Sequence, residues 1–426
     1  MRYKTLDAEL FKRNRSNFLG LMLNNSIAVF NSNDLMPKNA DQLMTFKQNS
    51  DLFYLSGIDQ EETLLVLIKK DSVAEEFLFI RETNENIKIW EGEKLSKYQA
   101  KNVSGVNNVF WGVDFENMLP QMMKGVENVY LNSNEHPRAN VVVESRDARF
   151  KKWIKSKYPN HIYKKSADLL YGLRAVKQVG EVELIKTACG ITKKGVERIF
   201  KHLKPGVYEY ELGAEIIHEF LMNKATGFAY DPIIASGANA CILHYGANND
   251  ICKDGDVVLM DFGAEYANYA SDLTRCFPVG GRFSKRQKQV YNSVLRVMQQ
   301  AKELLRPGVF LSEYEKNVGK LMEKELVDLG LISINDIAKF QETPAYKKYY
   351  MHGTSHHIGL DVHDVSNAET PLSQGMVLTC EPGIYIPEEN LGIRLENDIL
   401  IGENCNIDLM EDIPIDPEEI EQLLNI

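Results

Sequence analysis

Acidic side chains interrupt the apolar segments in the C-terminal half of this 426-residue chain. Three acids directly follow a run that is typical of a buried strand: Asp261 follows 257–260, Glu381 follows 377–380, and Glu396 follows 392–395. A fourth acid, Asp272, lies inside the strand-like segment 269–275. A buried, unpaired carboxylate is costly, so such acids are protonated, paired or bound to a cation. Taken singly, each acid fits an exposed strand end. Four of them in one region indicate a shared site.

Asp261 and Asp272 flank a segment that favours a β-hairpin. Gly263-Ala264-Glu265 is expected to lie near its turn. A hairpin of that length would bring both acids to one face of the sheet.

Histidines cluster further along the chain. Four of the nine histidines fall between positions 352 and 363: His352, His356, His357 and His363. A lone histidine is usually a polar residue with satisfied hydrogen bonds, but a cluster with interspersed glycines favours a site. One imidazole with four carboxylates carries about four negative charges, which two divalent cations would balance, and oxygen-rich ligation favours hard metals such as manganese. A dinuclear metal site is therefore a hypothesis.

Composition excludes some partners and locations. The chain has 49 basic and 60 acidic residues, a net charge of −11, which disfavours a general nucleic-acid binder because phosphate contacts need clustered Lys and Arg. No run approaches the roughly 18 apolar residues of a membrane span, and Asn24-Asn25 interrupts the best N-terminal candidate, so we expect no span and no secretory signal. The six cysteines form no CxxC pair, which favours reduced thiols and a cytoplasmic location.

The pattern of apolar residues predicts an α/β (α+β) fold in two domains, 1–172 and 173–426. In the first, strands at 64–68, 77–80 and 129–131 accompany a helix at 144–157. In the second, apolar spacing predicts helices at 181–203, 209–222, 285–305 and 311–329. Strands are expected there at 233–236, 256–262, 266–277, 376–386 and 392–401.

The chain lacks the phosphate-binding, zincin and serine-hydrolase motifs GxGxxG, GxxxxGK[ST], HExxH and GxSxG. It resembles instead the pita-bread metallopeptidases, and most closely the aminopeptidase P family. The segment 46–57 resembles the family's N-terminal signature. The catalytic-domain resemblance rests on the order and spacing of 241–245, 259–263, 271–278, 352–365, 378–386 and 392–401. The resemblance implies an N-terminal α/β domain followed by a pita-bread catalytic domain.

The resemblance also implies five metal ligands, with Asp272 and Glu396 bridging or flanking two divalent ions, most simply Mn²⁺. The five are Asp261, Asp272, His356, Glu381 and Glu396. A hydroxide held between the two metals would be the nucleophile. Glu381 would act first as general base and then as general acid towards the leaving proline nitrogen.

Other positions match residues that face the substrate in the family. His244 and His363 would stabilise the tetrahedral intermediate and the scissile carbonyl. His352 and Arg394 would line the proline pocket and orient the metal ligands. An ion pair between Arg394 and Glu396 is the structural alternative.

Three aromatic residues also match the family. Tyr230 and Tyr385 would support the site or line the pocket; alternatively both are core aromatics with satisfied hydroxyls. Trp90 resembles an N-terminal-domain residue that reaches a neighbouring subunit's site, with simple packing as the alternative.

The sequence departs from the family pattern at three places. Lys47 stands where arginine is common, and His357 stands where an aromatic or apolar residue is common. The segment after Asp364 is short and lacks an aromatic residue, so the wall of the proline pocket is expected to differ.

The predicted function is metal-dependent hydrolysis of the bond between an N-terminal residue and a following proline, in a homodimer or homotetramer. The closest alternative is a prolidase, which cleaves only Xaa-Pro dipeptides. The segment 46–57 and the short segment after Asp364 favour the aminopeptidase. Methionine aminopeptidase is disfavoured because residues 1–172 precede the catalytic domain. A metal-free creatinase-like hydrolase or a non-catalytic binding protein is the remaining alternative, although all five ligand residues are present.

Overall fold

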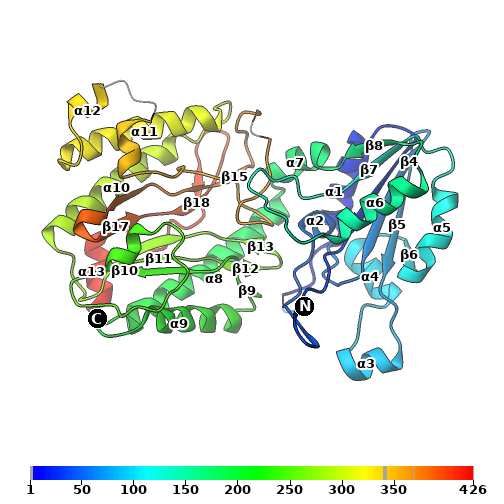
Figure 1. The fold of residues 1–426 in the computed structure, drawn as a ribbon, viewed down its shortest axis with the longest axis horizontal. Coiled ribbons are helices and arrows are strands. Elements are labelled where there is room, and N and C mark those ends of the chain that lie inside the picture. Colours follow the sequence, from blue (N-terminus) through cyan, green and yellow to red (C-terminus); the bar gives the residue numbers. More distant parts are fainter. Residues whose placement is uncertain (1–2, 339–342, 368, 426) are drawn as a thin grey trace. The chain divides into compact units, whose positions relative to one another are not determined.

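The computed structural model describes residues 3–338, 343–367 and 369–425. The chain forms two compact units, Tyr3–Arg174 and the part from Ala175 onward (Figure 1). Within the described residues, every helix is too short or too polar to cross a lipid bilayer.

The N-terminal unit is built on a six-stranded sheet in the order β6-β5-β4-β1-β7-β8. Strand β4 runs antiparallel to β1 and β5, whereas β5 pairs with β6, and β1 with β7 and β7 with β8, in parallel. The carboxyl ends of all strands except β4 therefore meet at one edge. The strands are β1 (Ser26–Asn31), β4 (Leu64–Lys70), β5 (Val73–Ile80), β6 (Asn108–Trp111), β7 (Asn128–Leu131) and β8 (Ile162–Lys165), with a separate hairpin of β2 (Pro37–Asn39) and β3 (Gln42–Leu43).

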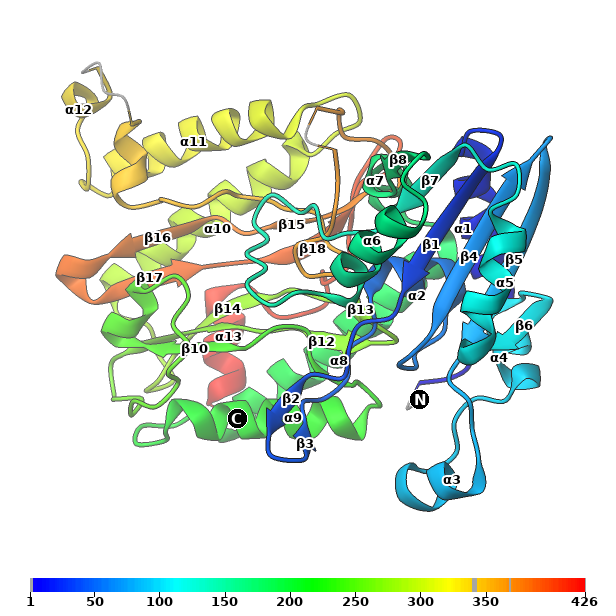
Figure 2. The same cartoon turned by 45° about the vertical axis from the view of Figure 1, so that its right-hand side comes forward.

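Helices cover both faces of this sheet. Alternate residues of a strand point to opposite faces: Val29 of β1 joins the apolar cluster beneath α5 and α6, while Phe30 packs edge-on against Phe18 of α1, with ring centroids 5.4 Å apart. Figure 2 shows α6 lying across β1. The helices are α1 (Ala8–Leu21), α2 (Ser50–Ser56), α3 (Glu85–Glu91), α4 (Lys97–Ser104), α5 (Phe115–Met122), α6 (Arg146–Lys157) and α7 (Ala167–Ala175).

These bounds confirm the strands and the helix predicted for this unit. They also show that the segment 46–57 forms helix α2 together with its two ends. Asn49 caps α2 by accepting hydrogen bonds from the backbone N–H groups of Asp51 and Leu52. Gly57 ends the helix at φ 66°, where a Cβ would lie 2.2 Å from the Phe11 ring, so only glycine fits. On α3, Trp90 is 86% exposed, so the packing interpretation of this residue is wrong within the chain.

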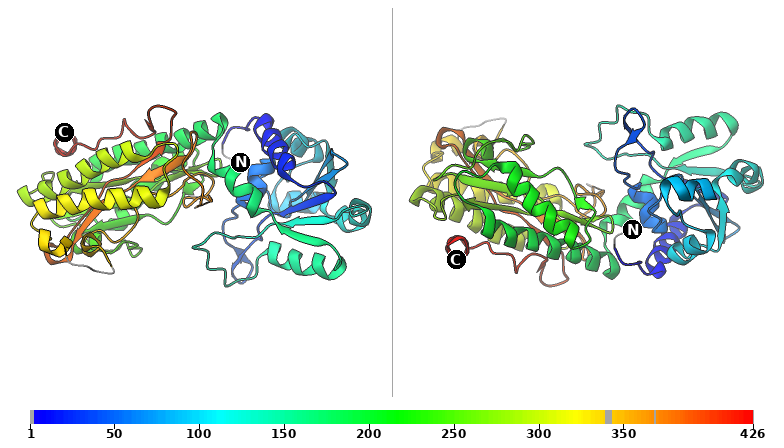
Figure 3. Two further views of the ribbon diagram at one scale, coloured as in Figure 1. Left: turned by 90° about the horizontal axis from the view of Figure 1, so that it is seen from above. Right: turned by 90° about the horizontal axis from the view of Figure 1, so that it is seen from below.

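In the C-terminal unit, small antiparallel sheets lie between two pairs of helices. The pair α8 (Val179–His202) and α9 (Glu209–Met222) packs on β9, β10, β12 and β13, and α10 (Lys285–Leu304), beside α11 (Leu311–Asp328), packs on β15–β17. Figure 3 shows each pair on its own side of the strands. Short helices α12 (Ile334–Ala338) and α13 (Pro417–Leu424) complete the unit.

The strands of this unit form short ladders, β10-β11-β14, β13-β12-β9, β15-β18-β19 and β16-β17. Their bounds are β9 (Gly227–Phe228), β10 (Ile233–Ser236), β11 (Val257–Asp261), β12 (Ala264–Tyr266), β13 (Tyr269–Ala270), β14 (Thr274–Pro278), β15 (Val377–Cys380), β16 (Gly383–Ile386), β17 (Leu391–Arg394), β18 (Asn397–Leu400) and β19 (Ile407–Asp408).

The four predicted helices and the strands predicted at 233–236 and 256–262 are confirmed, but the strands predicted at 266–277, 376–386 and 392–401 are each interrupted. The chain turns at Ala267 and Asn268, both at positive φ, close to the segment 263–265 that was expected near the turn. The single strand expected at 266–277 is three segments, and β11 pairs with β14 so that Asp261 faces Thr274. Gly263 serves close approach instead of a turn, because a Cβ there would lie 1.7 Å from the Ser271 carbonyl oxygen.

Candidate metal centre

The four acids predicted as ligands lie at or beside strand ends, where the ladders stop. Asp261 is the last residue of β11, and Asp272 lies two residues before β14. Glu381 directly follows β15, because Pro382 interrupts the strand predicted over 376–386. Glu396 lies between β17 and β18, and its backbone N–H donates to the Thr274 carbonyl at 3.1 Å.

His356 joins these acids from a loop that is fastened to β15. Its backbone N–H donates to Thr379 Oγ1 at 3.2 Å, and its neighbour His357 bridges to Leu378. Its Nε2 lies 3.5 Å from Asp272 Oδ2 and 3.7 Å from Glu381 Oε1. One ligand atom each from Asp272, His356 and Glu396 lie within 4.8 Å of one another, a spacing that one cation can span.

Tyr230 joins Asp261 to this group. Its hydroxyl donates to Asp261 Oδ1 at 2.6 Å and also contacts Asp272 Oδ1. The structure thus gathers all five predicted ligands in one place. Tyr230 is half-buried, whereas Tyr385 is fully buried and its hydroxyl bonds to Arg394 and His352.

Burial and neighbouring charges shift the pKa values of the clustered residues. Burial raises the pKa of Asp272 and raises that of Glu396 well above its usual range, with neighbouring carboxylates adding to both shifts. Burial also raises the pKa of Glu381 to about 7, although His356 and Arg394 oppose it. For His356, burial disfavours the charged ring, but Asp272 and Glu381 outweigh it and raise its pKa to about 9.

These residues fit divalent cations. Four carboxylates and one imidazole supply the oxygen and nitrogen donors that divalent cations bind. Burial and crowded like charges both disfavour charged carboxylates, and a cation among them would offset this. The chemistry of the donor set therefore matches a divalent metal site.

A hydrogen-bonded chain extends from the acids to the histidine loop. The Arg394 guanidinium donates to Asp261 Oδ2 at 2.6 Å through Nη2 and to the Tyr385 hydroxyl at 2.8 Å through Nη1. The Tyr385 hydroxyl lies 2.7 Å from His352 Nε2. Arg394 thus pairs with Asp261 and not with Glu396, which corrects the ion pair considered from the sequence.

His352 is neutral near pH 7, because burial and the nearby Arg394 lower its pKa to about 3. Its Nδ1 lies 2.7 Å from the Gly353 carbonyl oxygen and therefore carries the hydrogen, leaving Nε2 to accept from the Tyr385 hydroxyl. These two hydrogen bonds fix the orientation of the His352 imidazole beside Glu381, whose Oε2 lies 3.6 Å from His352 Nδ1.

The other two candidate histidines, His363 and His244, differ in their surroundings. The His363 ring lies edge-on to His356, with centroids 4.4 Å apart. His244 is exposed in the loop after the short 3₁₀ helix Gly237–Cys241.

Two residues of the site were not identified from the sequence. The Thr274 hydroxyl donates to Glu396 Oε2 at 2.6 Å and accepts from Arg394 Nε at 3.1 Å. Asp398, fully buried, accepts from the Asp272 backbone N–H at 3.1 Å. For Asp398 a signal existed, since it stands two residues after Glu396 within an apolar strand.

The fold thus places, between two pairs of helices, a set of donor groups that suits a divalent metal. Residues 183–403 match metallopeptidase family M24, and residues 11–130 match the aminopeptidase P N-terminal domain. The chain belongs to family M24 and has the two-domain architecture of aminopeptidase P.

Named relatives agree with this assignment over nearly the whole chain. The chain is 35% identical to the Xaa-Pro aminopeptidase of Escherichia coli, covering 97% of each protein, and 33% identical to that of Haemophilus influenzae, covering 99% of this chain and 98% of the relative. Zinc-substituted E. coli aminopeptidase P in complex with product superposes with a TM-score of 0.88 at 34% identity, covering 99% of each chain. The α/β (α+β) fold in two domains is thereby confirmed.

Proposed function

We propose that this chain is a metal-dependent aminopeptidase that hydrolyses the bond between an N-terminal residue and a following proline. The observation that carries the proposal is the convergence of four carboxylates and His356 beside the chain Arg394–Tyr385–His352. A proline peptide bond resists general peptidases because its nitrogen is tertiary, so a dedicated enzyme needs a pocket for the ring.

Asp261, Asp272, His356, Glu381 and Glu396 would hold two divalent ions, and Mn²⁺ suits their oxygen-rich donor set. When bound, such ions lower the pKa of a water and polarise a carbonyl. Glu381 is suited to exchange a proton with a bound water. Its side chain is 19% exposed, so solvent can reach it, and it lies beside His356 and His352. It would accept a proton from the attacking water and deliver it to the proline nitrogen.

The remaining residues would bind and orient the substrate. His244 and His363 would donate hydrogen bonds to the carbonyl oxygen as negative charge develops there. His352 and Arg394 would shape the proline pocket. Tyr385 is hydrogen-bonded to both His352 and Arg394, and Arg394 is also bonded to Asp261. These bonds would fix the proline pocket relative to the metal ligands. Tyr230 would fix the relative positions of Asp261 and Asp272.

We further propose domains at 1–172 and 173–426, a homodimer or homotetramer, and a cytoplasmic location. The exposed Trp90 on α3 supports an assembly in which it contacts a neighbouring subunit. The six cysteines all have free thiols, as a reducing compartment maintains them.

A hydrolysis assay separates this function from its alternatives. The protein is stripped with a chelator, restored with Mn²⁺, and given Xaa-Pro, Xaa-Pro-Xaa and Met-Ala-Xaa peptides. The proposal expects metal-dependent release of the first residue from Xaa-Pro-Xaa. Cleavage of the dipeptide alone would identify a prolidase, and preferred cleavage of Met-Ala-Xaa a methionine aminopeptidase. No cleavage of any peptide by the metal-loaded protein would contradict the proposal.

A further inference from the structure

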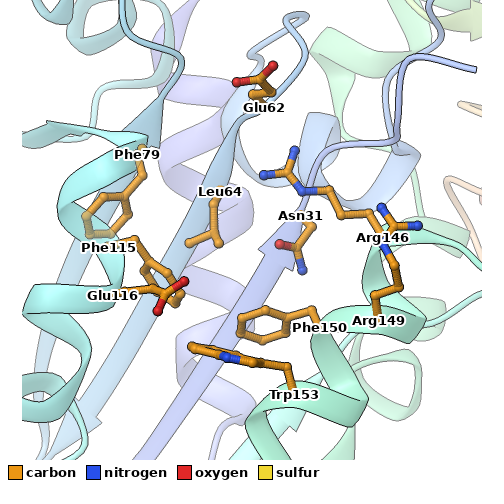
Figure 4. Close-up of a pocket in the computed structure, with 11 residues that line it drawn as sticks. Asn31, Glu62, Leu64, Phe79, Phe115, Glu116, Arg146, Arg149, Phe150 and Trp153 are labelled. Carbon is orange, nitrogen blue, oxygen red and sulfur yellow. The ribbon is translucent and has the colours of Figure 1, made fainter.

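The N-terminal unit contains an open pocket of about 400 Å³, separate from the candidate metal centre (Figure 4). Its sheet wall consists of Asn31 at the end of β1, Leu64 at the start of β4 and Phe79 near the end of β5, with Gly112 directly after β6. These residues mark the edge where the parallel strands end.

This edge is where open α/β sheets bind ligands. The pocket lies outside the ends of β1, β5 and β6. A crevice outside the carboxyl ends of strands is a common place for a ligand in such sheets. The volume of this pocket is in the range that holds a small organic molecule.

Aromatic rings form the apolar wall. Phe150 and Trp153 of α6 lie with ring centroids 5.5 Å apart, and Phe115 of α5 lies 6.0 Å from Phe150 and 6.3 Å from Trp153. Phe115 is buried, but Phe150 and Trp153 remain half-buried with their rings in the pocket. A planar ring could stack against this wall.

Arg146 is the polar feature that points to an anion. It is half-buried, and its Nη1 donates to Ser32 Oγ at 2.8 Å. Among residues 3–338, 343–367 and 369–425, no carboxylate lies within ion-pairing distance of it. Arg149, one turn along α6, is instead paired with Asp34 at 2.6 Å and bonded to the Glu144 carbonyl. Burial lowers the pKa of Arg146, whereas the nearby carboxylates of Asp34, Glu62 and Asp147 partly oppose this shift.

The rim limits how negative the ligand can be. Glu62 and Glu116 line the pocket and are exposed, and Arg149 is already neutralised by Asp34. A ligand with several negative charges would be repelled by both glutamates, whereas a single carboxylate can reach Arg146 in a bidentate arrangement. Figure 4 shows the Arg146 guanidinium extending between Glu62 and Asn31.

We propose that this pocket binds a small aromatic monocarboxylate, with the acid on Arg146 and the ring against Phe115, Phe150 and Trp153. The inference does not depend on the proposed peptidase activity, because every residue involved lies in the N-terminal unit.

The test is a titration of the full-length, metal-loaded protein with 3-phenylpropionate, with calorimetry and Trp153 fluorescence as readouts. Binding is expected, with a fluorescence change that Trp153→Phe removes. Phenethylamine, which has the ring without the acid, should bind at least ten-fold more weakly. No binding of 3-phenylpropionate up to about 10 mM would overturn the proposal.

Matched variants assign the binding to this pocket rather than to the metal centre. Arg146→Gln should weaken 3-phenylpropionate roughly ten-fold or more, and Arg146→Lys should weaken it less. Lys152→Gln, on the same helix but outside the pocket lining, should stay within about two-fold because its charge is exposed and paired with Glu144. Unchanged affinity in Arg146→Gln would refute the site. Tighter binding of AMP than of 3-phenylpropionate would refute the monocarboxylate class.

Discussion

Without metal, the crowded acids of the candidate centre should make stability fall as pH rises. Glu381 has an ordinary pKa of 4.5 that the fold raises to about 7. Between these values the folded state binds a proton that the unfolded state has lost, so each rise of one pH unit costs the fold about 1.4 kcal/mol. The metal-free fold should therefore lose on the order of 3 kcal/mol between pH 4.5 and 7.

His356 extends the same trend. Its pKa rises from 6.5 to about 9, so its proton stabilises the fold below pH 6.5 and this contribution is lost as pH rises through 9. A bound divalent cation takes the place of these protons. The stabilisation by metal should therefore be larger at pH 7.5 than at pH 5.

The assay is calorimetric unfolding of chelator-treated and metal-loaded protein at the two pH values. For a unit of this size, 3 kcal/mol corresponds to a fall in Tm of roughly 6–12 °C in the transition that metal shifts. Glu381→Gln is the matched control, since it is isosteric and cannot ionise, and its metal-free Tm should fall less. The same fall in wild type and Glu381→Gln would refute the assignment of the proton to this carboxyl.

Three further substitutions test parts of the site. His244→Ala should lower kcat roughly hundred- to thousand-fold with metal content unchanged, as expected for a residue that stabilises an oxyanion, and unchanged kcat would remove that role. In Gly263→Ala the new Cβ would clash with the Ser271 carbonyl and displace the segment that carries Asp272, so metal affinity should fall. Gly246→Ala is the control, because a Cβ there meets nothing within 4 Å. Metal titration of both variants should show weaker binding in Gly263→Ala only. Tyr385→Phe breaks the link between Arg394 and His352, so kcat/KM for Xaa-Pro-Xaa should fall about ten-fold with metal content retained, and wild-type kinetics would show that the link is dispensable.

The helices and most strands could be predicted because their apolar periodicity is strong. The helix predicted at 209–222 has the bounds of α9, and the strand predicted at 233–236 has those of β10. The residues of the hairpin turn could not be predicted exactly because Ala267 is an uncommon residue at positive φ, whereas Gly263 resembles a turn residue but serves a close backbone approach.

The acids of the site could be predicted because a carboxylate at the end of a buried strand is unusual. Their partners could not. Thr274 is a common strand residue, and its bonds to Glu396 and Arg394 depend on β14 lying beside the segment that joins β17 to β18. The Arg394 pairing with Asp261 likewise joins residues far apart in the sequence, so alternation along one strand suggested the wrong partner.

Metal stoichiometry is the most direct test of the dinuclear centre. Wild-type protein reconstituted with Mn²⁺ and desalted is measured by elemental analysis, beside Asp272→Ala and Glu396→Ala, and the same samples are assayed on Xaa-Pro-Xaa. We predict about two ions per chain in the wild type, and loss of both metal and turnover in either variant. Full turnover in a variant that binds no metal would contradict the account.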